Sequence, residues 1–176
     1  KAAEEAVREY QSFFPITIFR PTLIVGANAY WKKIFEMVRK GYPILGNGKN
    51  SWQLTYVEDL VSAIEYSLGN PRTYNEDFLV VSDEEYSFGD VINAVAHLQG
   101  VKRPISVPLW IGEWGSHPLS WYARVTGTKA LLTPYSVKKL GENRRFDSSK
   151  LRQLGWDSHY SLHKALSETY AELKSN

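Results

Sequence analysis

Few residues in the sequence have the types and spacing that chemistry requires, and the first group is glycine-rich. The stretch Gly46-Asn-Gly-Lys-Asn50 has two glycines and a lysine, as a phosphate-binding loop does. That motif also needs Gly where Pro43 stands and Ser or Thr where Asn50 stands. The GxGxxG turn that holds a pyrophosphate in dinucleotide-binding folds does not occur in the sequence. We therefore interpret the stretch as a hairpin turn before the apolar segment 52–57.

The histidines and possible nucleophiles give weaker signals. His159 and His163 are four residues apart, a spacing that can place two metal ligands on one face of a helix. The Glu of a zinc-protease helix does not lie between them, and His159 is expected to precede the helix, so we expect a surface pair and no metal site. The sequence has no GxSxG nucleophile elbow and no Cys, which excludes thiolate zinc sites, cysteine nucleophiles and disulfides.

An unusually aromatic segment at 109–122 is the third candidate. It contains Trp110, Trp114 and Trp121, separated by small Gly and Ser residues. Hydrophobic core, a substrate wall and a subunit contact all remain open as explanations. The small spacers between large aromatic rings favour a pocket or a contact surface, and we expect the segment to line the substrate region or a subunit contact.

The segments that must position these residues alternate between strand-like and helix-like patterns. Short all-apolar runs predict strands at 16–19, 52–57 and 78–81. Helical spacing predicts helices at 1–10, 30–40, 60–68, 87–100, 107–125, 134–140, 148–154 and 162–173. We expect burial of Ile18, Phe19, Val57, Val80 and Val81. The fold class is therefore α/β, although three strands are too few for a complete doubly wound sheet.

Composition bounds the partners and the location. The 21 basic and 19 acidic residues leave a formal charge of 21 − 19 = +2, which gives no electrostatic signature of nucleic acid or an anionic membrane. No apolar run approaches the roughly 20 residues of a membrane helix, and no secretory leader opens the chain. We therefore expect a small-molecule substrate, no nucleic-acid or membrane partner, and a cytoplasmic location.

Several short motifs, taken in chain order, match one family pattern. They are Lys1-Ala-Ala-Glu-Glu5, Ile16–Gly26, Gly46–Gly48, Thr55–Asp59, Phe78–Ser82, Phe146–Lys150 and Leu154-Gly-Trp156. Together they resemble the C-terminal half of the extended short-chain dehydrogenase/reductase family, over essentially the whole chain. That family includes nucleotide-sugar epimerases and dehydratases, 3-beta-hydroxysteroid dehydrogenases and dihydroflavonol-type reductases. The resemblance implies the last strands and helices of a Rossmann-like fold, without its N-terminal Gly-rich cofactor-binding half, in a single substrate-side region over residues 1–176.

The resemblance also assigns the cofactor end of a site. Lys1 and the Glu four residues later have the spacing of the family's catalytic lysine and the Glu that follows it. The Tyr that partners this lysine would precede the first residue of the chain. Lys1 would favour the phenolate of that Tyr and hold the nicotinamide ribose. Pro21, Thr22 and Leu23 would lie against the nicotinamide of NAD or NADP.

Four residues are expected to contact substrate: Leu23, Trp52, Trp114 and Trp121. Nucleotide-sugar enzymes of the family commonly have Asn at the position of Leu23 and Arg at the position of Trp52, where both hold the diphosphate. Apolar side chains cannot replace an amide and a guanidinium fork. These departures favour an oxidoreductase of the steroid-dehydrogenase or reductase kind, acting on a carbonyl or hydroxyl substrate. A nucleotide-sugar epimerase or dehydratase, and a non-catalytic binding or assembly relative, remain alternatives.

Two further expectations follow from the resemblance. Arg20 is expected either to face the nicotinamide end of the site or to form a salt bridge where a strand ends. Because the Gly-rich turn and the catalytic Tyr are absent, these 176 residues alone are expected to have no turnover and no measurable affinity for a nicotinamide cofactor. Uncovered apolar surface should favour binding to the missing N-terminal half or self-association.

Overall fold

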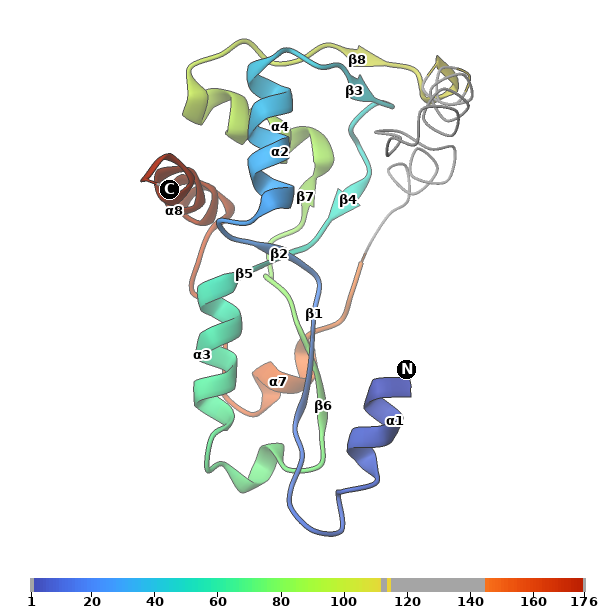
Figure 1. Ribbon diagram of the computed structural model, residues 1–176, viewed down its shortest axis with the longest axis vertical. Coiled ribbons are helices and arrows are strands. Elements are labelled where there is room, and N and C mark those ends of the chain that lie inside the picture. Colours follow the sequence, from blue (N-terminus) through green and yellow to red (C-terminus); the bar gives the residue numbers. More distant parts are fainter. Residues whose placement is uncertain (1, 112–113, 115–144, 176) are drawn as a thin grey trace. The chain divides into compact units, whose positions relative to one another are not determined.

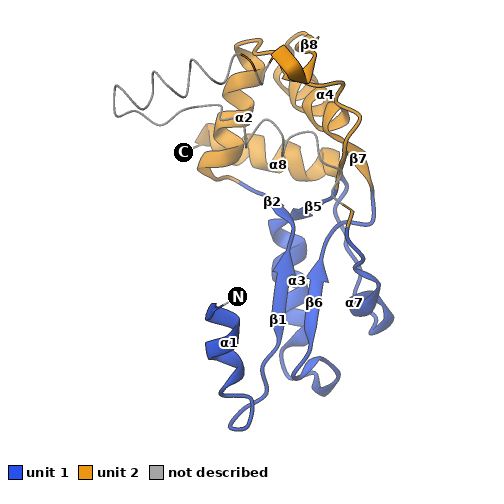
Figure 2. Ribbon diagram, turned by 90° about the vertical axis from the view of Figure 1, so that its right-hand side faces the viewer, with its two compact units in different colours: residues 1–26, 53–84, 146–161 blue, residues 27–52, 85–145, 162–176 orange. Residues whose placement is uncertain are grey.

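The computed structural model describes residues 2–111, 114 and 145–175, and the chain divides into two compact units (Figures 1 and 2). The first unit draws on residues 1–26, 53–84 and 146–161, and the second on residues 27–52, 85–145 and 162–176. Each unit is therefore assembled from three separate segments of the chain, and each is described by itself.

The first unit is built on parallel strands. Strand β1 (Ile18–Pro21) pairs with β6 (Asp77–Val80), and β2 (Leu23–Val25) pairs with β5 (Leu54–Tyr56). Parallel partners need long crossover connections, which is why each pair joins segments far apart in the sequence. The helical elements of this unit are α1 (Ala2–Arg8), α3 (Val57–Ser67), the short 3-10 helix η1 (Pro71–Thr73) and α7 (Ser149–Gln153).

The core of the first unit lies where α3 and α7 contact β6. Phe78 and Val80 are 1% and 0% exposed, and alternate residues of β6 supply them. Leu151 of α7, with an exposure of 0%, packs in the same cluster. Trp156, also buried there, donates its indole N–H to Ser62 Oγ at 3.1 Å. The 5-residue helix α7 is therefore held by packing, since so short a helix is not stable alone.

The second unit combines short strands with longer helices. Strand β3 (Ile44–Leu45) pairs in parallel with β8 (Ser106–Val107), and β4 (Ser51–Trp52) pairs antiparallel with β7 (Tyr86–Ser87). Its longer helices, among the described residues, are α2 (Ala29–Arg39), α4 (Phe88–Gln99) and α8 (Leu162–Ser175). Helix α4 contacts both α2 and α8.

Local sequence signals explain where the longer helices begin and end. Ser87 caps α4 through a capping box with Asp90, and Gly100 ends the helix in the left-handed conformation, with φ 66°. Asn28 caps α2 by accepting hydrogen bonds from the first backbone N–H groups of the helix. Trp31, Phe35 and Val38 then bury one face of α2 at helical spacing.

The α/β prediction is confirmed, and burial follows it in part. Val80 and Val81 are buried as expected, with exposures of 0% and 1%. Ile18, Phe19 and Val57 are only half-buried, so the expectation for them is wrong. Strand β1 pairs with one described neighbour, β6, and Val57 begins α3 instead of ending a strand. The helix predicted at 134–140 and most of the one predicted at 107–125 lie outside the described residues.

The predicted hairpin at the glycine-rich stretch is wrong. The strands on either side of it, β3 and β4, pair with β8 and β7 and not with each other. Gly48 has φ +68°, and a Cβ there would lie 3.2 Å from Gly89 Cα. The Gly48 carbonyl accepts the Gly89 N–H at 2.8 Å. Glycine is therefore required by a close approach to the start of α4.

We expect Phe78→Ala to lower the free energy of unfolding by about 3–5 kcal/mol, because it leaves a cavity among fully buried side chains. Phe13→Ala is the matched control, since Phe13 is 80% exposed in the same unit and its loss should stay within about 0.5 kcal/mol. Urea unfolding followed by tryptophan fluorescence measures both, because Trp156 packs in the Phe78 cluster. Equal losses for the two variants would contradict this core.

Candidate functional site

The candidate site is the carboxyl edge of the parallel strands in the first unit. Figure 2 shows β1 and β6 side by side, with both arrowheads pointing the same way. Pro21 is opposite Val80 at this edge, and β2 begins two residues later at Leu23. Ligands of open α/β sheets bind outside the carboxyl ends of the strands. The predicted cofactor residues Pro21, Thr22 and Leu23 therefore lie together at such an edge.

A buried threonine hydroxyl holds this edge together. Thr55, in β5, is 1% exposed, and its Oγ1 donates to the Val80 carbonyl at 2.5 Å. The same Oγ1 accepts the Thr22 N–H at 3.0 Å and lies 2.9 Å from Thr22 Oγ1. The Ser82 N–H donates to the Leu54 carbonyl at 2.9 Å, so the chain leaving β6 also bonds to β5. These bonds fix residue 22 between the two strand pairs.

The geometry determines what the edge can offer a ligand. Because the single hydroxyl proton of Thr55 goes to the Val80 carbonyl, the Thr22 hydroxyl must be the donor in the pair of hydroxyls. Thr22 Oγ1 therefore keeps lone pairs that can accept from a ligand. Pro21 has no backbone N–H, and Pro21 and Leu23 are half-buried. The edge thus combines apolar contact with one acceptor, which fits a flat nicotinamide better than a phosphate.

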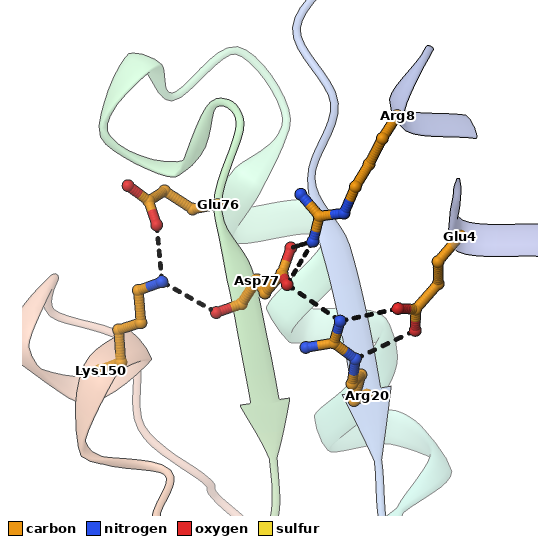
Figure 3. A network of polar contacts seen from close by, with 6 residues as sticks. All are labelled: Glu4, Arg8, Arg20, Glu76, Asp77 and Lys150. Atoms are coloured by element: carbon orange, nitrogen blue, oxygen red, sulfur yellow. Dashed lines mark hydrogen bonds and ion pairs between the residues drawn. The ribbon is translucent and has the colours of Figure 1, made fainter. Parts of the chain in front are cut away.

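Arg20 forms a salt bridge at the strand end, which is one of its two predicted alternatives. Its guanidinium donates to both carboxylate oxygens of Glu4, at 3.0 and 2.8 Å, and lies 2.9 Å from Asp77 Oδ2 (Figure 3). Arg8 donates to the two oxygens of Asp77 at 2.6 and 2.5 Å. Lys150 donates to Glu76 at 2.6 Å beside this group. The network ties α1 and α7 to the paired strands β1 and β6.

The network shifts the protonation of its carboxylates. The hydrogen bond from Arg20 lowers the pKa of Glu4, and bonds to Glu4 and Asp77 raise the pKa of Arg20. The pKa of Asp77 is also lowered: partial burial alone would raise it, and the hydrogen bonds from Arg8 and Arg20 outweigh that burial. Arg20 is therefore held as a cation between two carboxylates, in a structural role.

Sequence reasoning missed a second ionic pair just past the carboxyl end of β6. Asp83 contacts the guanidinium of Arg152, whose Nε is buried and has no hydrogen-bond partner among the described residues. Burial raises the pKa of Asp83, with a further contribution from nearby Asp157, while Arg152 acts in the opposite direction. No motif marks this pair, since its members lie 69 positions apart and meet only through the packing of α7 on β6.

The remaining predicted residues divide between the units or lie outside the described residues. Lys1 and Trp121 are outside them, so their expected roles stay predictions. Leu23 belongs to the first unit, whereas Trp52 and Trp114 belong to the second. Trp52 is 5% exposed and packs on Phe88, with ring centroids 4.6 Å apart. Its indole N–H has no hydrogen-bond partner among the described residues.

The described part of the aromatic segment is not core. Trp110 and Trp114 are 61% and 77% exposed, and Ile111 is 43% exposed. Exposed side chains of this size are available for contact with a substrate or another protein. The prediction that the segment lines a substrate region or a subunit contact is compatible with this exposure and stays a prediction.

The histidines form a different pair from the one that the spacing suggested. The rings of His97 and His163 are 6.1 Å apart between centroids, and the His159 N–H donates to Asp59 Oδ1 at 2.8 Å. Burial raises the pKa of Asp59, and backbone hydrogen bonds partly offset that rise. Within the described residues, no three acidic or histidine side chains group to hold a metal ion, and no helix is long and apolar enough to cross a membrane.

Comparison with known proteins gives a family match over the first part of the chain. Residues 1–81 match the NAD dependent epimerase/dehydratase family. The matched stretch contains β1, β2, β5 and α3, and it ends one residue after β6. It therefore includes every strand that forms the candidate edge.

Individual relatives extend the similarity beyond the matched stretch. The chain is 27% identical to N-acetyl-alpha-D-glucosaminyl-diphospho-ditrans,octacis-undecaprenol 4-epimerase of Escherichia coli O157:H7, over 95% of this chain and 53% of that enzyme. UDP-glucuronic acid 4-epimerase from Bacillus cereus, solved with NAD, has a TM-score of 0.69 at 17% identity, over 99% of this chain and 50% of that one. The corresponding values for dTDP-glucose 4,6-dehydratase from Bacillus anthracis, also solved with NAD, are 0.66, 19%, 99% and 50%. The fold is thus Rossmann-like α/β, and the chain spans about half the length of the curated relatives it matches.

We expect Thr55→Val to lower the free energy of unfolding by about 1–3 kcal/mol, because it removes the three hydrogen bonds of the Thr55 hydroxyl and leaves the Thr22 N–H and the Val80 carbonyl with only their long mutual bond of 3.4 Å. Thr17→Val is the matched control: the half-buried Thr17 hydroxyl makes one bond, to the Thr73 carbonyl at 2.8 Å, and its loss should cost less. Denaturant unfolding compares the two. A larger loss for Thr17→Val would mean that Thr55 does not hold the edge.

The lowered pKa of Asp77 predicts how stability depends on pH. A carboxylate whose pKa is lower in the folded state stabilises the fold above its ordinary value of 3.8, and that contribution disappears as the pH falls through the lowered value. We expect the melting temperature of the natural chain to fall more steeply below about pH 4 than that of Asp77→Asn. Molar salt should narrow the difference by screening these partly exposed charges. Parallel pH profiles in low salt would contradict the assigned role.

Proposed function

We propose that the chain forms the substrate-side half of an NAD-dependent epimerase that acts on a sugar carried by a diphosphate. The observation that carries the proposal is the similarity to the undecaprenol-linked N-acetylglucosamine 4-epimerase, which extends over 95% of the chain. The family match adds the NAD-dependent class. The half-length coverage supports the assignment to one half of such an enzyme.

The relatives favour this sugar reading over the steroid-dehydrogenase reading. Leu23 and Trp52 were the reason to expect a substrate without a diphosphate. The structure weakens that reason at Trp52, because its buried indole N–H has no described partner and could donate one hydrogen bond. Leu23 still lacks the amide that is common in nucleotide-sugar enzymes. Leu23 is therefore the departure that still counts against a diphosphate substrate.

The carboxyl edge provides the part of the site that this chain contributes. In such an enzyme, bound NAD supplies reversible acceptance of a hydride, so that a sugar carbon can be oxidised and then reduced on its opposite face. Pro21 and Leu23 would contact the nicotinamide, and the Thr22 hydroxyl would accept a hydrogen bond from it. Their positions are fixed by Thr55, so the contact surface exists before the ligand arrives.

The pyrophosphate of NAD needs a different element. A Gly-rich turn at the start of a helix binds it in this fold class, and no GxGxxG occurs in the 176 residues. The proposal therefore includes that these residues alone lack turnover and bind NAD weakly or not at all. Activity is to be tested on the protein as its gene encodes it.

The test is epimerisation at the sugar C4. We expect the protein, with NAD, to convert UDP-N-acetylglucosamine or N-acetylglucosaminyl-diphospho-polyprenol into its C4 epimer, measured by chromatography of the released sugar. Leu23→Asp should lower kcat/KM by at least about tenfold, because it puts an unpaired charge on a half-buried apolar edge and repels a diphosphate. Leu68→Asp, at a side chain 74% exposed in the same unit, should leave activity unchanged.

Two comparisons keep this test decisive. Leu23→Met retains an apolar side chain of similar size and should keep most of the activity, and melting temperatures show whether Leu23→Asp still folds. Oxidation of a steroid alcohol such as pregnenolone, without epimerisation of either sugar, would overturn the proposal in favour of the dehydrogenase alternative. If the protein converts none of these substrates, the result would favour the non-catalytic alternative.

A further inference from the structure

A groove in the second unit, formed by residues other than those of the carboxyl edge, has the chemistry of a binding site. It is a cavity of about 230 Å³ lined by residues of α2, α4 and α8, which Figure 2 shows in the second unit. This volume lies below the roughly 300 Å³ at which pockets for drug-sized ligands begin, so a ligand of the groove must be smaller than a drug-sized molecule. Phe35 and Tyr170 line it, and their rings stack with centroids 4.9 Å apart and planes inclined by 12°.

The charge of the groove is positive. Lys32, Arg39 and Lys174 line it together with one acidic residue, Glu36, so the balance is 3 − 1 = +2. Among the described residues, neither Lys32 nor Arg39 forms a salt bridge. Lys174 lies over the Tyr170 ring, with Nζ 4.3 Å from the centroid. Such a set of cations matches a ligand with two negative charges.

Gln99 adds an unused hydrogen-bond acceptor. Its Nε2 donates to the Phe35 carbonyl at 3.1 Å, and this bond identifies the other amide atom as the oxygen. That Oε1 is buried and has no hydrogen-bond partner among the described residues. A buried acceptor without a donor is costly, and because Gln99 lines the groove, a ligand that supplied the donor would relieve that cost.

We propose that this groove binds a small phosphate monoester that also carries a hydroxyl group. A phosphate monoester has a charge close to −2 at neutral pH, which equals the charge balance of the groove with opposite sign. Lys32 and Arg39 bind the phosphate, a ligand hydroxyl donates to Gln99 Oε1, and the stacked rings support the carbon skeleton. The inference does not depend on the proposed epimerase function.

Glucose 1-phosphate is a suitable probe, with inorganic phosphate and glucose for comparison. Calorimetry on the full protein should show binding of glucose 1-phosphate that is weakened about tenfold by Lys32→Gln or Arg39→Gln. Lys33→Gln is the matched control, because Lys33 is an exposed neighbour on α2 that does not line the groove. Gln99→Leu should weaken glucose 1-phosphate but leave inorganic phosphate unchanged. Affinity should fall below about pH 6, where the phosphate takes up its second proton.

Several results would overturn the proposal. Equal effects of Lys32→Gln and Lys33→Gln would mean general electrostatic attraction, and binding unaffected by Lys32→Gln, Arg39→Gln and Gln99→Leu would place the probe elsewhere, for instance at a sugar-diphosphate site. No binding at millimolar glucose 1-phosphate would also refute it. Circular dichroism and melting temperature show which variants fold, and any that do not are replaced by Lys32→Met and Arg39→Met, which keep apolar length without the charge.

Discussion

The carboxyl edge of the first unit depends on one buried hydroxyl, that of Thr55. It donates to the Val80 carbonyl and accepts both donors of Thr22, so it joins the end of β6, the middle of β5 and the residue between β1 and β2. Regular strand pairing cannot make these bonds, because Thr22 lies where the chain passes from one strand pair to the other. The Thr22 N–H makes a long backbone bond there, to the Val80 carbonyl at 3.4 Å, and the Thr55 side chain supplements it. The position of Pro21 and Leu23 at this edge is a consequence of this arrangement.

The ionic network at the opposite, amino end of β6 stabilises the same pair of strands. Asp77 is the first residue of β6, and two guanidinium groups from α1 and β1 converge on it. Asp77 and the Glu76–Lys150 pair beside it join three separate stretches of sequence, whereas a pair of exposed ions alone contributes little. The network matters because it attaches α1, which has no buried residue of its own, to the strands. The packed core and the Thr55 bonds contribute the larger energies.

Sequence patterns predicted the described helices of both units well and the strands less well. Ser87, Asn28 and Gly100 act locally, through hydrogen bonds and dihedral angles within a few residues, so the ends of α2 and α4 could be read from the sequence. The two-residue strands β3, β4, β7 and β8 carry no periodic signal, and their partners are decided by tertiary packing. The residues of the candidate site could also be predicted only in part. Pro21, Thr22 and Leu23 came from a family resemblance, whereas Thr55, Asp77 and Gln99 act through partners at least 25 positions away, which no spacing rule reports.

The two departures from the nucleotide-sugar pattern do not have equal weight once their surroundings are known. Trp52 is almost fully buried, sits in a two-residue strand and stacks on Phe88, the first residue of α4, so a large ring at this position has a packing reason that is independent of any substrate. Leu23 is half-buried, and an amide would be tolerated there without emptying a core. Of the two departures, the apolar residue at position 23 therefore bears more directly on the prediction of the substrate. The sequence argument against a sugar diphosphate treated both positions alike, and the structure leaves only Leu23 to support it.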